Sequence, residues 1–141
     1  MGWPEITMRM AKNEDGPRIA ELCEKGCGFG GFEEWNIDWG QIAPWWIVAE
    51  HEGQIVGAIQ FCPSRPVARL EMLSIDPGAD IRVRGVVADL LTRQGTAQAH
   101  LAGCSAVSAV IEEGAESFKK VAERRGWFAG ARGDLMYKRC N

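Results

Sequence analysis

The sequence predicts a single mixed α/β domain over residues 1–141. Segments with the two-residue alternation of strands occur between segments whose apolar residues recur at helical spacing. The length suits one domain, since domains commonly have about 100–150 residues. The composition, 46% hydrophobic and 25% charged, is that of an ordinary globular protein with a core of its own.

The N-terminal part predicts a strand followed by a helix. Residues 6–11 alternate apolar and polar side chains, as a half-buried strand does. Residues 13–15 (Asn-Glu-Asp) then supply a polar helix start with acidic groups near the positive end of the dipole. The helix is expected to stop at the glycines at 26 and 28. Residues 27–44 are irregular, with a short helix expected over 33–41.

The rest of the chain predicts a hairpin and then alternating elements. Residues 45–61 read as strand, Glu-Gly-Gln turn and strand. The further elements expected are a strand over 67–75, a helix over 84–102, a strand over 105–111, a helix over 115–125, and a strand pair over 128–131 and 134–140. Together these make about seven strands and four helices in one mixed sheet architecture.

Charge and composition exclude several classes of protein. Sixteen Lys and Arg against nineteen Asp and Glu give a net charge of −3, which argues against binding nucleic acid through a basic surface. No segment has the about 18 uninterrupted apolar residues of a membrane span, and the N-terminus lacks the apolar core of a signal peptide. Five scattered cysteines indicate reduced thiols in the cytoplasm. No His/Cys set has metal-ligand spacing, so no metal is expected.

Residues 70–91 carry the strongest chemical signal, because a strand there runs through a short loop into a helix. The first amides of a helix have no intrahelical partner, and the dipole places roughly +0.5 charge at that end. Gly85 lets a bound anion approach the backbone, and Arg82 and Arg84 add charge. This pattern favours a phosphate site; the alternative is a solvated helix start with ordinary surface arginines.

The segment Arg82-Val83-Arg84-Gly85-Val86-Val87 resembles the Q/R-x-x-G-x-G/A pyrophosphate loop of the GNAT superfamily of acyl-CoA N-acyltransferases. Residues 73–77 resemble the end of the family's fourth strand, residues 118–127 its late helix and the Gly that follows, and the opening its first strand and helix. The resemblance implies the GNAT fold and transfer of an acetyl group from acetyl-CoA to a primary amine by direct attack on the thioester.

The resemblance also implies which residues bind and react. Acyl-CoA would lie between the splayed fourth and fifth strands, with its pantetheine arm paired to backbone groups of Leu73 and Ile75. The residues implied for binding CoA are Leu73, Ser74, Ile75, Arg82, Val83, Arg84, Gly85, Val86 and Val87. Glu71 is implied as general base, directly or through a water. Some family members, including phage-encoded ones, carry a glutamate there; the alternative is an ion pair with Arg69 or another strand.

Aromatic residues crowd the irregular segment and offer an acceptor pocket. Phe32, Trp35 and Trp39 are the predicted acceptor-binding residues, and such irregular segments often carry binding residues. The alternative is core or interface packing, which is the commoner fate of aromatic clusters. The acceptor amine itself is not identified by the sequence. A homodimer is expected, since family members often dimerise.

Departures from the family pattern leave a second function open. Val87 stands where the family has Gly or Ala, and its branched side chain is expected to crowd a phosphate. The late helix carries Ala122 at the place of the family's tyrosine acid. The main alternative is therefore a GNAT-fold protein that acts as a CoA-binding or protein-interaction module. A modifier of a macromolecule, of toxin or phage type, is a third reading.

Overall fold

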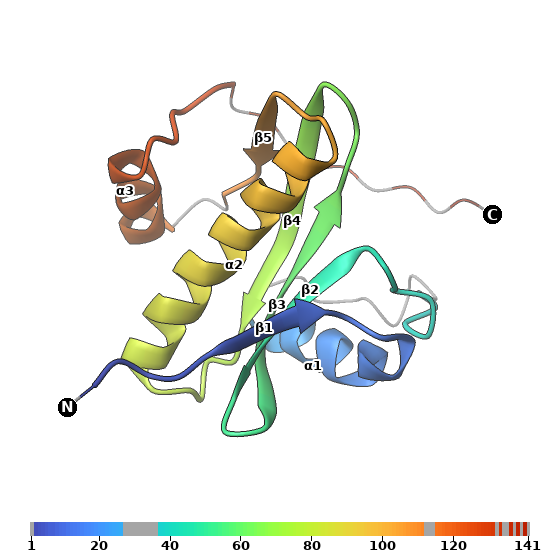
Figure 1. Cartoon of the computed structure of the whole chain (residues 1–141), viewed down its shortest axis with the longest axis vertical. Coiled ribbons are helices and arrows are strands. Elements are labelled where there is room, and N and C mark those ends of the chain that lie inside the picture. The colour runs from blue at the N-terminus through green and yellow to red at the C-terminus, as the bar shows by residue number, and fades with distance from the viewer. Residues whose placement is uncertain are drawn as a thin grey trace. The chain divides into compact units, whose positions relative to one another are not determined.

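The computed structural model of the chain (Figure 1) describes residues 2–26, 37–111 and 115–131 together with positions 133, 136, 138 and 140. Contacts divide the chain into two units, residues 1–109 and residues 110–141, and each is described by itself. Within the described ranges, no helix combines the length and the apolar character needed to cross a membrane.

A five-stranded sheet forms the centre of the first unit, with its strands in chain order (Figure 1). The strands are β1 (Thr7–Met10), β2 (Trp46–His51), β3 (Gln54–Cys62), β4 (Val67–Ile75) and β5 (Ala106–Ala109). Antiparallel pairs join β1 through β4, whereas β5 lies parallel to β4. The mixed α/β architecture expected from the sequence is confirmed.

Helices cover the two faces of this sheet. A single 3-10 turn, η1 (Asn13–Asp15), leads into α1 (Gly16–Gly26), which contacts β3 and β4. The long helix α2 (Ile81–Leu101) connects β4 to β5 and contacts β2 through β5. Gly57 faces α2 while the next residue, Ala58, belongs to the α1 cluster. Since neighbouring strand residues point to opposite faces, α1 and α2 lie on opposite sides of the sheet.

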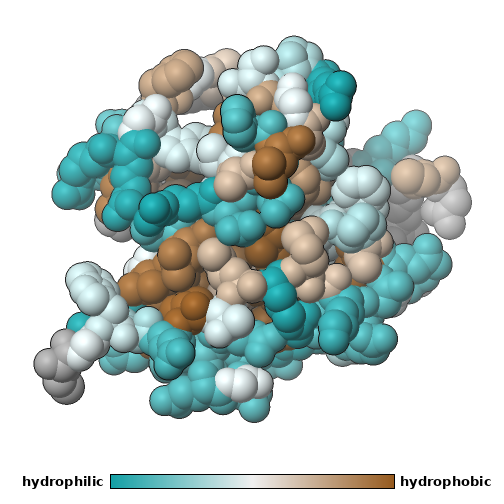
Figure 2. Space-filling view, viewed as in Figure 1, coloured by the Kyte–Doolittle hydropathy of each residue, from teal (hydrophilic) through white to brown (hydrophobic). Residues whose placement is uncertain are grey.

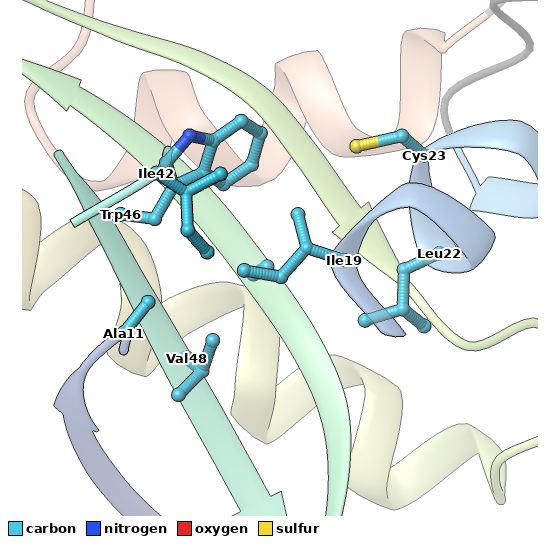
Figure 3. Packing of buried hydrophobic residues seen from close by; sticks show 8 residues of the cluster. Ala11, Ile19, Leu22, Cys23, Ile42, Trp46 and Val48 are labelled. Atoms are coloured by element: carbon cyan, nitrogen blue, oxygen red, sulfur yellow. The ribbon is translucent and has the colours of Figure 1, made fainter. Parts of the chain in front are cut away.

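The α1 face of the sheet is closed by one hydrophobic cluster (Figure 3). Ile19, Leu22 and Cys23 of α1, at the helical spacing expected from the sequence, are at most 1% exposed. They pack with sheet residues and with Ile42, which precedes β2. The strand residues of the cluster are Trp46, Val48 and Ala58, with Ala11 after β1. Burial of this set fixes the position of α1 over β3 and β4.

The α2 face is closed by a stripe of residues four apart along the helix. Its members are Val83, Val87, Leu91, Gly95 and Ala99, all of them buried. A Cβ at Gly95 would lie 2.6 Å from Leu70 Cδ2, so that glycine permits the close approach of α2 to β4. In Figure 2 the apolar side chains on this side gather in the middle of the view, where Figure 1 places α2.

The second unit contains α3 (Glu116–Arg124), close to the helix expected over 115–125. Glu116 in its first turn and Arg124 in its last turn complement the helix dipole. The strand expected over 128–131 was wrong, since residues 127–131 have no strand structure and the Phe128 side chain is 89% exposed. Of the second expected strand, positions 136, 138 and 140 are described and are not in a strand, while 134, 135, 137 and 139 lie outside the described residues.

The structure therefore has fewer elements than the sequence predicts. The described residues form five strands and three α-helices, against about seven and four expected. The helix expected over 33–41 is absent from its described part, residues 37–41, and the rest lies outside the described residues. The Asp38 carboxylate accepts hydrogen bonds from the Gly40 amide and the Gln41 side chain. Such an Asx turn competes with helix formation.

Candidate active site

The carboxyl end of β4 extends beyond its ladder with β5 and carries a bulge. The parallel ladder pairs Val67 through Leu70 with Ala106 through Ala109, and β4 then continues for five residues to Ile75. Against β3, Ala58 pairs with Ser74 but Gln60 pairs with Glu71. Two residues of β4 therefore face one residue of β3, which is a β-bulge. Residues 71–75 of β4 are therefore not paired with β5.

Met72 is the strained residue of the bulge. Its φ of 56° lies in the left-handed region, where a side chain costs about 1–2 kcal/mol. Strain of this kind is found at functional sites more often than elsewhere. A positive φ at methionine leaves no signal in the sequence, and sequence reasoning did not find the bulge.

The helix that follows β4 begins earlier than expected. Asp80 is the N-cap of α2, and its carboxylate accepts a hydrogen bond of 2.9 Å from the Arg82 amide. The Arg84 amide donates to the Asp80 carbonyl at 2.9 Å. Residues 82–87, which resemble the family's pyrophosphate loop, thus lie in the first two turns of the helix. The expected start at residue 84 was wrong because the cap signal of Asp80 was overlooked.

The side chains of this segment separate into a buried and an open side. Val83 and Val87 are 6% and 0% exposed, and a Cβ on Gly57 would meet Val87 Cγ1 at 2.5 Å. The expectation that the Val87 side chain would crowd a phosphate is corrected, because that side chain points into the core. Val86 is half-buried. Gly85 is exposed, and a Cβ there would have no neighbour within 4 Å.

Positive charge gathers at the start of α2. Arg82 is exposed, and Arg84 is half-buried with its Nε shielded from solvent and lacking a hydrogen-bond partner among the described residues. The amides of the first helical turn add the positive end of the dipole. Gly85 has no packing neighbour that would account for a glycine. These features together suit an anion bound at the open side of the helix start.

Glu71 lies on the α1 face of β4. Leu70 contacts the α2 side at Gly95, so the alternation of the strand directs Arg69 and Glu71 to the other face. The Arg69 guanidinium lies 3.6 Å from the Glu71 carboxylate, and the Glu71 side chain is 31% exposed. The ion pair expected as the alternative reading is present. Because Arg69 is 58% exposed, this ion pair contributes at most about 1 kcal/mol to the stability of the fold.

The thiol of Cys62 lies near the Arg69–Glu71 ion pair. Cys62 pairs with Arg69 in the β3–β4 ladder. Burial, together with the charge of Glu71, raises the pKa of the Cys62 thiol above its ordinary value. This shift favours the thiol over the thiolate, which is the nucleophilic form.

The last three residues of β4, Leu73 to Ile75, are predicted to bind CoA, and the structure shows the surroundings of each. Ser74 is fully buried, and its hydroxyl donates to the Met72 carbonyl at 2.9 Å and lies 3.4 Å from Cys23 Sγ. Its side chain therefore belongs to the α1 face. The last α1 residue, Gly26, approaches Ile75 so closely that a Cβ would lie 2.7 Å from the Ile75 carbonyl oxygen. Leu73 occupies the bulge beside Met72.

The aromatic residues expected to bind the acceptor are described only in part. Phe32 and Trp35 lie outside the described residues. Trp39 is half-buried against the α1 cluster, with its ring centroid 6.1 Å from that of Trp46 and the two planes tilted by 58°. This packing accounts for an aromatic residue at position 39. A part of Trp39 in acceptor binding stays a prediction.

Arg18 is a residue of the site that sequence reasoning missed. Its Nη2 contacts the Asp76 carboxylate at 2.9 Å, and its Nε donates to the Ile55 carbonyl at 3.0 Å. The same Asp76 carboxylate accepts the Gly78 amide at 2.8 Å. Arg18 thus ties α1 to β3 and to the turn that leads into α2. The Asp-Pro-Gly sequence indicated a turn, but no sequence signal linked it to an arginine 58 positions earlier.

No metal site was found in the part of the chain that the structure describes. Within it, no three or more His, Cys, Asp or Glu side chains come together as a group that could hold an ion.

No family model and no curated protein sequence matches the chain. A transcriptional regulator from Bacillus halodurans C-125 superposes with a TM-score of 0.69 at 18% identity, over 95% of this chain and 100% of that one. The aminoglycoside N-acetyltransferase AAC(6')-Iy, in complex with CoA, gives 0.68 at 18% identity, over 99% and 98%.

A third similar structure is N-acetylglutamate synthase from Neisseria gonorrhoeae, complexed with coenzyme A and L-arginine. It gives a TM-score of 0.72 at 18% identity, over 96% of this chain and 30% of that chain. At identities this low the likeness concerns the fold. We conclude that the chain has the fold of the GNAT acyltransferases.

Proposed function

We propose that this protein is an N-acetyltransferase that transfers the acetyl group of acetyl-CoA to a primary amine. The observation that carries the proposal is the end of β4, which continues beyond its last pair with β5, Leu70–Ala109, and leads directly into a helix start with two arginines. The fold likeness supports it, because AAC(6')-Iy and N-acetylglutamate synthase were both crystallised with CoA. A fold alone does not determine a reaction, so the proposal rests on this local geometry.

In this proposal the pantetheine arm lies along the end of β4, and the pyrophosphate lies at the open side of the α2 start. Arg82 and Arg84 supply charge, and the amides at Ile81 and Val83 belong to the first turn, whose amides have no intrahelical partner. The amides of Val86 and Val87 lie past the first turn of the helix and take part in its backbone hydrogen bonds. The anion is therefore expected nearer to the N-cap, Asp80, than the family's loop pattern implies. Gly85 leaves room beside it for the phosphates.

The reaction joins an amine nitrogen to the thioester carbonyl carbon. The new C–N bond forms, the C–S bond breaks, and CoA leaves as its thiolate. The proton lost by the amine passes to the Glu71 carboxylate, directly or through one water. Holding both substrates together contributes several kcal/mol without any dedicated acid, so Ala122 at the place of the family's tyrosine is compatible with turnover.

The proposal is tested by calorimetric titration with acetyl-CoA. We expect micromolar binding, about −8 kcal/mol, and a loss of at least tenfold in affinity for Gly85→Glu, because its carboxylate would face the phosphates. The open space around Gly85 means that this variant should fold, which circular dichroism checks. Ala97→Glu, which adds the same carboxylate at an exposed position further along α2, serves as the control and should bind acetyl-CoA normally. Wild-type protein that gives no heat, or Gly85→Glu that binds normally, would contradict the proposed site.

Several further expectations belong to the same proposal. They are a single catalytic domain over residues 1–141, a homodimer, a cytoplasmic location and a kinship with phage-type members. The single domain rests on length and composition, the location on the scattered cysteines, and the other two on the family resemblance. Light scattering of the purified protein would measure the oligomeric state.

A further inference from the structure

The N-terminal segment brings an exposed tryptophan to the start of α2. Met8 pairs with Ala49, Ala49 with Gly57, and Gly57 with Ile75. The start of β1 and the end of β4 therefore lie at the same end of the sheet. The residues before Thr7 continue beyond that end, where α2 begins, and Figure 1 shows the N-terminal segment reaching the first turn of α2.

Trp3 and Arg82 are in contact there. The Arg82 guanidinium carbon lies 5.9 Å from the centre of the Trp3 ring, within the range of a cation–π interaction. A long hydrogen bond of 3.5 Å joins Arg82 Nη2 to the Gly2 carbonyl. Pro4 follows Trp3 and restricts its backbone to extended conformations. The indole is thus held beside a cation at the anion-binding end of the helix.

The contact with Arg82 leaves most of the indole open. Trp3 is 81% exposed, although tryptophan is on average a highly buried residue. One face of the ring is directed at the guanidinium, and the high exposure shows that the other face is not covered by the described chain. Aromatic faces of this kind stack on nucleic-acid bases, since every base has a π-face.

We propose that Trp3 is the platform on which the adenine ring of acetyl-CoA stacks, on the face that Arg82 leaves open. The inference rests on the proposed function. Adenine is joined to the pyrophosphate through one ribose, so phosphates at the α2 start bring the ring to the neighbourhood of Arg82. Trp3 would then contribute to the affinity for the nucleotide end of the cofactor and have no part in the chemistry at the thioester.

The test compares two ligands and three variants by calorimetry. The ligands are acetyl-CoA and acetyl-4′-phosphopantetheine, which lacks the adenosine together with its 3′-phosphate and one phosphate of the pyrophosphate. Trp3→Ala should weaken acetyl-CoA binding about tenfold, equivalent to about 1.4 kcal/mol, and leave the binding of acetyl-4′-phosphopantetheine unchanged. Trp3→Phe should retain most of the affinity. Leu101→Ala, which removes a 78% exposed side chain about 30 Å away at the other end of α2, is the matched control.

The outcomes separate this inference from the proposed function. If the wild-type protein binds neither ligand, the proposed function fails and the stacking platform fails with it. If the wild-type protein binds acetyl-CoA and Trp3→Ala binds it equally well, only the platform is refuted. Equal weakening of both ligands by Trp3→Ala would also refute the platform, because the effect would then not depend on adenine. Circular dichroism of each variant shows that the fold is retained.

Discussion

At the scale of single residues, Glu71 is the first residue of β4 beyond the ladder with β5, and its carboxylate is partly exposed. Its charge partner, Arg69, lies 3.6 Å away and is itself 58% exposed. Water screens such a pair, so the carboxylate is not locked in it. A base for acyl transfer must reach an incoming amine or its ordered water, and the 31% exposure of the Glu71 side chain permits this.

Replacing Glu71 by Gln should lower kcat by about 10²–10⁴-fold, the usual contribution of general acid–base catalysis. Acetyl-CoA affinity should stay the same, because the amide keeps the shape of the side chain. Thiol release measured with a panel of primary amines checks the first point, and titration calorimetry the second. Arg69→Gln removes the partner alone and should retain the rate within about threefold. Full turnover by Glu71→Gln would leave Glu71 with the ion pair as its only role.

At the scale of elements, α2 depends on two glycines for its contact with the sheet. Gly57 in β3 lies under Val87 and Leu91, and Gly95 in α2 lies over Leu70. A strand and a helix approach each other most closely where one of them has no side chain. This packing directs the Val87 side chain inward and so leaves Gly85 on the open side of the helix.

Gly57→Ala should destabilise the protein by about 1–3 kcal/mol, because the new Cβ would lie 2.5 Å from Val87 Cγ1 in a packed core. Urea unfolding measures the change. The double variant Gly57→Ala/Val87→Ala should lose less than the sum of its two single variants, since removing the valine methyls makes room for the new one. Gly85→Ala, in open space, should gain up to about 1 kcal/mol in helix propensity. If the losses of unfolding free energy caused by the two single variants simply add in the double variant, residues 57 and 87 are not in contact.

These two elements also show how far sequence reasoning reaches. The strand over 67–75 was predicted with its observed bounds, because alternation and the Asp-Pro-Gly turn both depend on local residues. The bulge at Met72 was not, since its φ follows from pairing with β3. The role of Val87 was mistaken because its inward direction depends on Gly57, 30 positions earlier. The family loop pattern points to the start of α2 but does not show which of its side chains turn into the core.

At the scale of the whole molecule, two aspartates pair with arginines that contact distant parts of the chain. Asp15 accepts two bonds from the Arg9 guanidinium, at 2.7 and 3.0 Å, and Arg9 also contacts Glu50 of β2. The bond from Arg9 is the main cause that lowers the pKa of Asp15 below its ordinary 3.8. For Asp76 the Gly78 amide, and after it Arg18, lowers the pKa. Both carboxylates therefore favour the folded state while they are charged.

Acid should consequently unfold the protein through these two groups. A carboxyl whose folded pKa lies below its unfolded value contributes its full stability above about pH 5 and loses it as the pH falls through the folded pKa. The variant Asp15→Asn/Asp76→Asn should therefore be less stable than wild type at pH 7 and lose less stability between pH 7 and pH 3. Urea unfolding at both pH values measures this difference. Glu52→Gln, at a side chain that is 84% exposed in the β2–β3 turn, controls for the loss of one surface charge. Parallel pH dependence of wild type and double variant would mean that the acid sensitivity lies in other groups.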